Sequence, residues 1–380
     1  MSQIKLLHSG GNGVNISAPD TNPSSDRTVK LPSTDADGTI TTKDSDNQLQ
    51  QVVGVNGGQL SHRNIIVNGA MTVAQRTTSV TSLANGYKAV DRYRHTSTGL
   101  DAGPTHEQAD ISSGTTPYTL GFRKSYKLTN GDQSSGAGAD DRFQTTYAIE
   151  AQDIAASGWN YLSSSSFITL SFWCKSSVAQ NFYGFVNSSD GTEQSFPFQT
   201  GSLSADTWTK VTVKIPGNSS IQIDNNVDIG LKIHWDLFEG TNLTDSGVSL
   251  NQWGAYSATA KTPDQTSTWY TTNDSTFELT GVQLEVGDTA TSFEHRSYAD
   301  ELRRCQRYYV RDGDDKYHYN ASSATVEHIE LPVQMRADPT IDLESVPGSG
   351  SVNRSRVNWF TVTSMGTSSG NIRYSAEAEL

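Results

Sequence analysis

Seven aromatic and polar residues that lie outside the clean strands or beside turns have the chemistry of a sugar-binding site. An exposed aromatic ring gives the apolar face of a sugar a surface to stack on, and a nearby Asp or Asn can hold the hydroxyl groups. The candidate ligand-binding residues are Trp235, Asp236, Asn251, Trp253, Tyr256, Trp269 and Tyr270. The ligand class that they indicate is a glycan.

The same rings have a second interpretation, because large aromatic side chains are mostly well buried. Each ring can instead belong to the core or to a contact between subunits. A fold-level analogy points back toward sugars: the segments TLSFWCKSS and TWTKVTVKIP look like strands of carbohydrate-binding jelly rolls. Such an analogy concerns the fold, since function is carried by the site.

The sequence carries no signature of catalysis. Its eight His residues lie singly, and it has no HExxH, no G-x-S-x-G and no glycine-rich phosphate loop. Two acidic pairs have the residue types of a glycosidase, although only their spatial separation can support that activity. The pairs are Asp236 with Glu239, and Glu294 with Glu301. We predict no catalytic residues and a protein that is not an enzyme.

The composition indicates an acidic protein with polar, solvent-exposed surfaces. Hydrophobic residues make up 34% of the 380 residues and charged residues only 18%, which is not the composition of a highly charged disordered chain. The 28 Lys and Arg residues against 41 Asp and Glu residues give a net charge of −13. An acidic protein is poorly suited to hold a phosphate backbone, so we expect no nucleic-acid partner.

Metal, cofactor and membrane signals are missing from the sequence. Cys174 and Cys305 are far apart and fit small buried side chains, so they indicate neither a disulfide framework nor a metal site. The start MSQIKLLHSGGNG has too short an apolar run for a signal peptide, and no segment approaches the ~18 apolar residues of a membrane span. We expect no metal, no cofactor and no membrane insertion.

The best strand signal contains a break in its alternation. Phe277 and Leu279 alternate with polar residues, after which the apolar phase shifts by one residue to Val282 and Leu284. A one-residue slip would turn one apolar set toward solvent. A β-bulge at Gly281 is therefore predicted, because it keeps both halves of the strand facing the core.

A short amphipathic helix is predicted after this strand. Ser297, with Asp300 three residues on, matches a helix cap. Helical spacing then continues through Tyr298, Leu302, Cys305 and Tyr309. We expect this helix to connect two β domains; the alternative is a surface helix docked on its own domain.

Short strands dominate the rest of the chain. Before residue 60, apolar pairs such as Val14 with Ile16 and Val29 with Leu31 are too short to bury a core alone, so partner chains must supply the missing faces. A disordered arm is the alternative there. Between 61 and 296, alternating runs at 167–174, 208–215 and 227–233 are typical of an antiparallel sandwich.

These signals predict an all-β protein with four parts. They are a β-rich N-terminal segment that needs partner chains (1–60), a central jelly-roll-like β-sandwich of roughly eight strands (61–296), a short connecting helix (297–310) and a small C-terminal β domain (311–380).

Four parts of the chain resemble tailed-phage tail fibre and tail-associated receptor-binding proteins. The longest is GVQLEVGDTATSFEHRSYADELRRCQRYY, and the sandwich opens with an N-x-I-x-N-G-x-M-x-V-x-Q-R pattern followed by YKAVDRY, which is similar to the G-Y-x-x-D-R-Y pattern of that family. The N-terminal segment contains DRTVKLP and DGTI, which resemble units of phage fibre stems, and the ending AEAEL also fits the family.

The resemblance implies a structural virion protein of the phage tail, assembled in the host cytoplasm. It implies a homotrimer with a threefold shaft or attachment segment, joined to other tail or adaptor proteins through its N-terminal segment. The implied partner is a host surface glycan or lipopolysaccharide, bound through many weak contacts for host attachment. Two alternatives stay open: a head or collar fibre or decoration protein without receptor binding, and a glycan depolymerase.

Overall fold

The computed structural model describes residues 3–7, 13–17, 62–319, 326–363, 365 and 370–380. The chain divides into two compact units, Met1–Val52 and Val53–Leu380. In the first unit, β1 (Gln3–Leu7) pairs antiparallel with β2 (Gly13–Ser17). The strand expected at Val29 and Leu31 lies outside the described residues.

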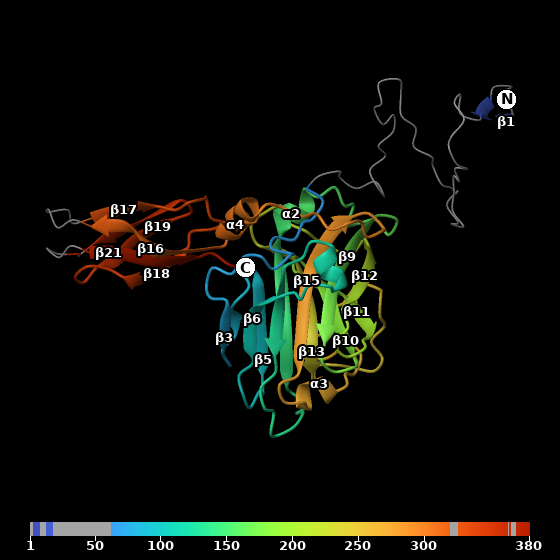
Figure 1. Cartoon of the computed structure of the whole chain (residues 1–380), viewed down its shortest axis with the longest axis horizontal. Coiled ribbons are helices and arrows are strands. Elements are labelled where there is room, and N and C mark those ends of the chain that lie inside the picture. The colour runs from blue at the N-terminus through green and yellow to red at the C-terminus, as the bar shows by residue number, and fades with distance from the viewer. Residues whose placement is uncertain (1–2, 8–12, 18–61, 320–325, 364, 366–369) are drawn as a thin grey trace. The chain divides into compact units, whose positions relative to one another are not determined.

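The larger unit contains a β-sandwich of two antiparallel sheets, which confirms the predicted all-β fold with its jelly-roll-like body (Figure 1). One sheet has seven strands in the order β14 (Gly254–Ala255), β11 (Gln194–Ser202), β10 (Asn181–Ser188), β13 (Ile229–Glu239), β8 (Arg142–Glu150), β5 (Tyr93–Thr98) and β4 (Gly86–Tyr87). The other has six, in the order β12 (Thr209–Pro216), β9 (Phe167–Ser176), β15 (Thr276–Val286), β7 (Lys124–Thr129), β6 (Thr105–Asp110) and β3 (Ser79–Thr81). The described sandwich thus has more strands than the roughly eight expected.

Period-two alternation builds the core between the sheets. In β9, Ile168, Leu170 and Phe172 are fully buried, while Phe167 and Trp173 are only partly buried on the other face. β12 pairs with β9 and keeps Lys210 exposed. Each strand therefore presents one apolar face inward, as its sequence predicts.

The predicted bulge in β15 is confirmed. The pairing of β15 with β9 shifts register between Thr280 and Gln283, and Gly281 has a φ of +61°. Leu279 and Val282 are both buried, so the apolar residues on either side of the shift face the core. A Cβ atom at Gly281 would lie 2.7 Å from the ring of Phe122, which leaves no room for another residue.

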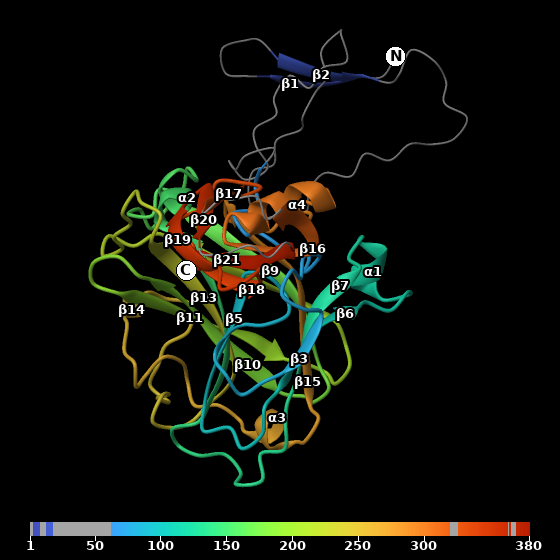
Figure 2. The ribbon, with the colours of Figure 1, turned by 90° about the vertical axis from the view of Figure 1, so that its left-hand side faces the viewer.

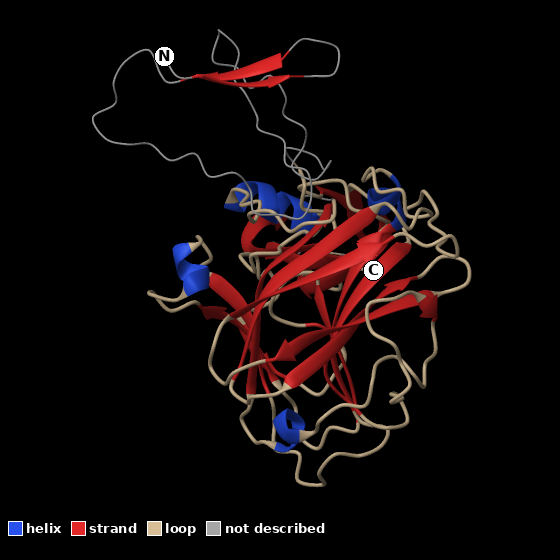
Figure 3. Ribbon diagram, turned by 90° about the vertical axis from the view of Figure 1, so that its right-hand side faces the viewer, coloured by secondary structure: helices blue, strands red, loops and turns tan. Residues whose placement is uncertain are grey.

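Helices are few and short among the described residues (Figure 3). They are α1 (Thr116–Thr119), α2 (Ala151–Ala155), α3 (Thr268–Thr271) and α4 (Tyr298–Gln306). The predicted cap of α4 is present, because the Ser297 side chain accepts a hydrogen bond from the Asp300 amide. The expected apolar face is only partly right: Cys305 is buried and Tyr298 is 60% exposed. The helix ends before Tyr309, which begins a strand.

The C-terminal part consists of two three-stranded antiparallel sheets with their own core of apolar residues. The first sheet has the order β16 (Tyr309–Tyr319), β21 (Gly370–Glu377) and β18 (Thr340–Ser345), and the second β17 (Val326–Glu330), β20 (Trp359–Thr363) and β19 (Ser351–Arg356). Apolar residues at Ile329, Leu331, Val333 and Met335 alternate with polar ones and would predict a longer strand, but β17 ends at Glu330, since Pro332 cannot donate to a ladder. Met335 is nevertheless buried. The proposed boundaries at 296 and 310 stay predictions.

The residues of the phage-like Q-R and D-R-Y patterns bind the end of the chain. The Arg92 guanidinium is buried, is ion-paired with Glu379 and lies 3.4 Å above the ring of Tyr308. Arg76 reaches the same carboxylate at 3.3 Å, and the Gln75 side chain donates to the Tyr309 carbonyl at 2.7 Å. These residues therefore fasten the C-terminal strands to the sandwich.

Candidate functional site

Three of the seven candidate ligand-binding residues are core residues, which corrects the prediction that they are exposed. Trp235 packs between Tyr93 and Phe172 in the sandwich core. Trp269 and Tyr270, in α3, are 0% exposed. Because all three rings are closed off by protein, none of them can stack on a sugar in this structure.

Three further candidates are also not arranged as a stacking site. The Trp253 indole N–H donates to the Pro216 carbonyl at 2.7 Å, and its ring packs on Phe196. Asp236 is 1% exposed, so it cannot meet a hydroxyl group as proposed. Asn251 is exposed in a turn with a φ of +60°, and its backbone amide donates to the Pro197 carbonyl at 2.8 Å.

Tyr256 is the one candidate that lines a cavity. The cavity has a volume of about 380 Å³ and lies on the outer face of the seven-stranded sheet, opposite the core; Figure 2 shows β14, β11, β10, β13 and β5 of this sheet. Its size is within the range of small-ligand sites. We call it the outer-face cavity; its lining residues are Tyr87, Arg94, Thr96, Arg142, Gln144, Thr146, Ala148, Phe185, Ile229, Lys232, His234, Tyr256, Lys261 and Leu380.

A row of three rings forms one side of the outer-face cavity. Phe185 of β10 stacks on His234 of β13, with centroids 4.1 Å apart and planes 13° from parallel. Tyr256, from the loop after β14, lies 6.1 Å from Phe185 and is partly exposed. The register places Phe185 directly opposite His234, which explains the stacking. Phe185 is 1% and His234 9% exposed, so Tyr256 is the ring of this row that offers an accessible apolar surface to a sugar face.

Hydrogen-bonding side chains continue the same face across β8 and β5. Thr146 lies opposite both His234 and Arg94, and its hydroxyl is 3.0 Å from His234 Nδ1. Gln144 and Thr96 form the next pair on the same face, two residues along each strand. The arrangement therefore combines donors and acceptors with an aromatic row, as ligand sites for polar molecules do.

His234 is held neutral. Burial lowers the pKa of its imidazole well below the usual value of 6.5, and four nearby cations lower it further. Those cations are Lys232, Lys261, Arg142 and Arg94. A neutral imidazole can donate from one nitrogen and accept at the other, so this ring can serve either kind of hydroxyl contact.

Two carboxylates lie beneath this surface. Gln144 Nε2 donates to Asp236 Oδ1 at 2.6 Å and to Glu239 Oε1 at 3.3 Å. Glu239 is 1% exposed and forms ion pairs with Lys261 at 2.9 Å and with Arg142 at 3.1 Å. Burial, followed by the charge of Glu239, raises the pKa of Asp236. The pair supports the floor of the cavity but does not line it.

The second acidic pair, Glu294 and Glu301, also makes contacts that hold the structure together. Arg296 binds Glu294 at 3.2 Å and Glu301 at 3.6 Å, and Glu294 accepts a hydrogen bond from the Asn64 amide.

Among the described residues, no group of three or more His, Cys, Asp and Glu side chains is placed to hold a metal ion. The described helices include none long and apolar enough to cross a bilayer.

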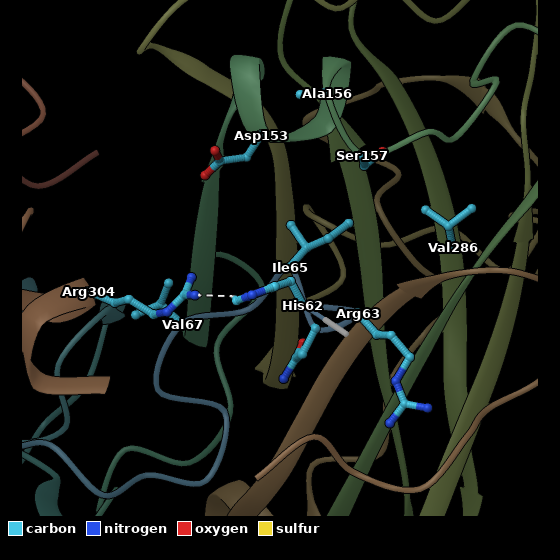
Figure 4. A pocket seen from close by; sticks show the side chains of 10 residues that line it. His62, Arg63, Ile65, Val67, Asp153, Ala156, Ser157, Val286 and Arg304 are labelled. Carbon is cyan, nitrogen blue, oxygen red and sulfur yellow. Dashed lines mark hydrogen bonds between the residues drawn. The ribbon is translucent and has the colours of Figure 1, made fainter. Parts of the chain in front are cut away.

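Two other cavities are less suited to a polar ligand with a ring face. Figure 4 shows one of about 210 Å³, in which Arg304 contacts His62. Its other lining residues include Asp153 and Ser157, which come from the region of α2. Another, of about 320 Å³, lies on the six-stranded sheet and includes Trp173. The second has an aromatic wall, and it provides a matched comparison for experiments.

Sequence reasoning missed most of the outer-face cavity. The signal was present in β8, where the outward-facing Gln144 and Thr146, which are themselves 5% and 8% exposed, alternate with the core residues Phe143 and Tyr147. Polar residues on the outward phase of a central strand usually mean a wetted face. That face becomes a cavity only because strands distant in sequence are neighbours.

Comparisons with known proteins leave the family open. No family model matches the chain, and no curated protein gives a significant match. Three solved structures share the fold at low similarity. The enzymatically active domain of tailspike protein 4 of bacteriophage CBA120 has a TM-score of 0.31 and 10% identity over 59% of this chain, which spans only 21% of that protein.

The other two are carbohydrate-binding modules. A family 11 module of a cellulosomal cellulase from Clostridium thermocellum gives a TM-score of 0.25 and 13% identity, covering 57% of this chain and 98% of the module. The CBM22-1 xylan-binding domain of Xyn10C from Paenibacillus barcinonensis gives 0.26 and 11%, covering 56% and 94%. With TM-scores this low, a ligand for this protein has to be inferred from its own residues.

Proposed function

We propose that this protein binds a carbohydrate in the outer-face cavity. The observation that carries the proposal is the row of Tyr256, Phe185 and His234 beside the hydroxyl and amide groups of Thr146 and Gln144. Sugars need both an apolar surface for their ring face and paired donors and acceptors for their hydroxyl groups. Tyr256 is the accessible ring, and a neutral His234 can donate or accept.

In the virion context, the protein is proposed to be a tail fibre or spike that attaches a phage to a host surface glycan or lipopolysaccharide. The support is the sequence resemblance at 281–309 and in the Q-R and D-R-Y patterns. A homotrimer mounted through the N-terminal segment would turn weak single contacts into firm attachment. The alternative is a head or collar fibre, which the location of the chain in intact particles would distinguish.

Glycan-array binding tests the proposed site. Wild-type protein is compared with Tyr256→Ala, and Trp173→Ala on the six-stranded sheet serves as a matched aromatic control. Stacking contacts to aromatic rings are worth about 1 kcal/mol, so we expect Tyr256→Ala to weaken binding about fivefold. Loss of binding in Trp173→Ala alone would move the site to the other sheet.

A separate measurement tests the proposed assembly. Light scattering of the full chain is expected to give three times the mass of one subunit. A stable monomer at micromolar concentration would contradict the homotrimer while leaving carbohydrate binding untouched, because the cavity is lined by one chain.

Depolymerase activity is the second candidate, favoured by one observation: Asp236 and Glu239 share a hydrogen-bond donor and are therefore close. Retaining glycosidases place two carboxyl groups about 5–5.5 Å apart. Both side chains here are buried, and we propose that the protein is not an enzyme. Incubation with a bound glycan followed by an assay for new reducing ends would decide, and Asp236→Asn would have to abolish any release.

A further inference from the structure

We propose that the outer-face cavity selects acidic glycans, with Arg94 and Lys232 holding an anionic group carried by a sugar. This inference rests on the carbohydrate-binding function proposed above and specifies the class of carbohydrate. The anionic group can be a carboxylate, a sulfate or a phosphate ester. These three sources share the same recognition chemistry, and the experiment below separates them.

The lining of the cavity is strongly unbalanced in charge. Four cationic side chains line it, and no Asp or Glu side chain occurs among its lining residues in the described chain. The cations are Arg94, Arg142, Lys232 and Lys261. Leu380, the last residue of the sequence shown, also lies at the cavity, and its terminal carboxylate accepts a hydrogen bond from the Tyr87 hydroxyl at 2.8 Å. Such a concentration of positive charge stands out in a protein with a net charge of −13.

Ion pairing leaves part of this charge uncompensated. Lys261 and Arg142 share the single carboxylate of Glu239, which lies below the surface. Arg94 donates to the Thr96 hydroxyl at 2.7 Å. Among the described residues, neither Arg94 nor Lys232 has a carboxylate partner. Both side chains are partly exposed, so their charged groups are available to a ligand.

The sheet places these two cations so that they can converge. Arg94 lies on β5 and Lys232 on β13, with β8 between them. Strand spacings put their Cα atoms about 12 Å apart, two strands across and two residues along. Long Arg and Lys side chains can both reach a group above Thr146 from these positions. An Arg guanidinium can bind an oxyanion through two parallel hydrogen bonds, and Lys adds a point charge.

Burial is the main cause of the low pKa of the His234 imidazole, and the nearby Lys232, Lys261 and Arg142 lower this pKa further. The centre of the cavity is thus a neutral ring surrounded by positive charge. A sugar ring can lie against the partly exposed Tyr256 while its acidic substituent points toward Arg94 and Lys232.

The test compares acidic glycans with their neutral counterparts. Full-length protein is applied to an array that holds uronic-acid, sulfated and phosphorylated glycans beside neutral glycans of the same linkage. The best acidic binder is then titrated by calorimetry against its carboxyl-reduced, desulfated or dephosphorylated form. We expect at least tenfold weaker binding of the neutralised form, and weaker binding of the acidic form as salt is raised.

Charge-removing variants assign the effect to residues. Arg94→Gln and Lys232→Gln are each expected to lower the ratio of affinities for the acidic glycan and its neutralised form about tenfold. Lys210→Gln, which removes a charge from the exposed face of the other sheet, is the matched control. Unchanged far-UV circular dichroism and melting temperature establish that each variant is folded.

The outcomes separate this inference from the proposed function. Equal binding of acidic and neutralised glycans, or an unaltered affinity in the Arg94→Gln/Lys232→Gln double variant, overturns acid selectivity and leaves carbohydrate binding in place. Binding to no glycan of either class overturns carbohydrate binding, and the inference with it.

Discussion

Two buried histidines make the stability of the sandwich sensitive to mild acid. His95 and His106 are both 0% exposed, and their rings lie 4.6 Å apart in the core. Burial lowers the pKa of His95 to about 3 and that of His106 to about 2, with neighbouring cations adding to the effect. Neither ring therefore carries a charge in the folded protein at pH 5.

The sign of the pH effect follows from proton binding. Below the unfolded value of 6.5, the unfolded chain binds a proton on each histidine and the folded protein does not, so stability falls as the pH drops. Between about pH 7.5 and pH 5, each such histidine costs about 2 kcal/mol of unfolding free energy. This value does not depend on how far the folded pKa lies below 5.

His95→Phe isolates the contribution of one ring. Both ring nitrogens of His95 lack a hydrogen-bond partner among the described residues, and the ring already packs edge-on against Phe143, so Phe is a compatible replacement. Whatever the substitution costs in packing, the difference in unfolding free energy between variant and wild type should shift by about 2 kcal/mol in favour of the variant from pH 7.5 to pH 5.

Urea unfolding followed by tryptophan fluorescence and far-UV circular dichroism measures this difference at both pH values. His328→Phe, at an exposed position in β17, controls for the exchange of one ring for another. A difference between His95→Phe and wild type that is the same at both pH values would refute the linkage argument, because it would mean that the folded protein accepts the proton as easily as the unfolded chain.

Three further predictions concern the elements that hold the structure together. Glu379→Gln should lower the unfolding free energy by about 3 kcal/mol, because it leaves the buried Arg92 charge without its partner; Arg92→Met in the same background should recover part of the loss, and additive effects would argue against coupling. Gly281→Ala should cost about 1–3 kcal/mol in chemical denaturation, since the left-handed φ and the Phe122 ring both oppose a Cβ; no change would mean that the bulge relaxes freely. Ser297→Ala should cost about 1 kcal/mol through loss of the α4 cap while Ser297→Asp costs little, and an unaltered melting temperature in the Ala variant would show that the cap is dispensable.

The local elements of this fold were readable from the sequence because their causes lie within a few residues. The phase shift around Gly281 predicted a bulge that the register confirms, and Ser297 with Asp300 predicted the start of α4. Alternation likewise located β9 and β12. Each of these signals reflects backbone geometry or capping, which depends on near neighbours.

At the end of α4 the helical spacing of the sequence was misleading, because a tertiary contact determined the local structure. Tyr309 continues the helical spacing of α4 but starts β16, where it pairs with Glu377 of the last strand. Pairing with a distant strand overrides a weak helical preference at the end of a short helix. The sequence pattern alone contains no trace of that partner.

Which aromatic residues face solvent was also decided by the tertiary structure. Trp235 is buried between the sheets, whereas Tyr256 is partly exposed above one of them. The outer-face cavity is lined by Arg94, Thr146 and His234. Thr146 and His234 are 88 residues apart in the sequence, yet all three residues lie side by side because their strands pair. Sequence determined which faces are polar; the order of strands in the sheet, set by long-range packing, determined that those faces meet.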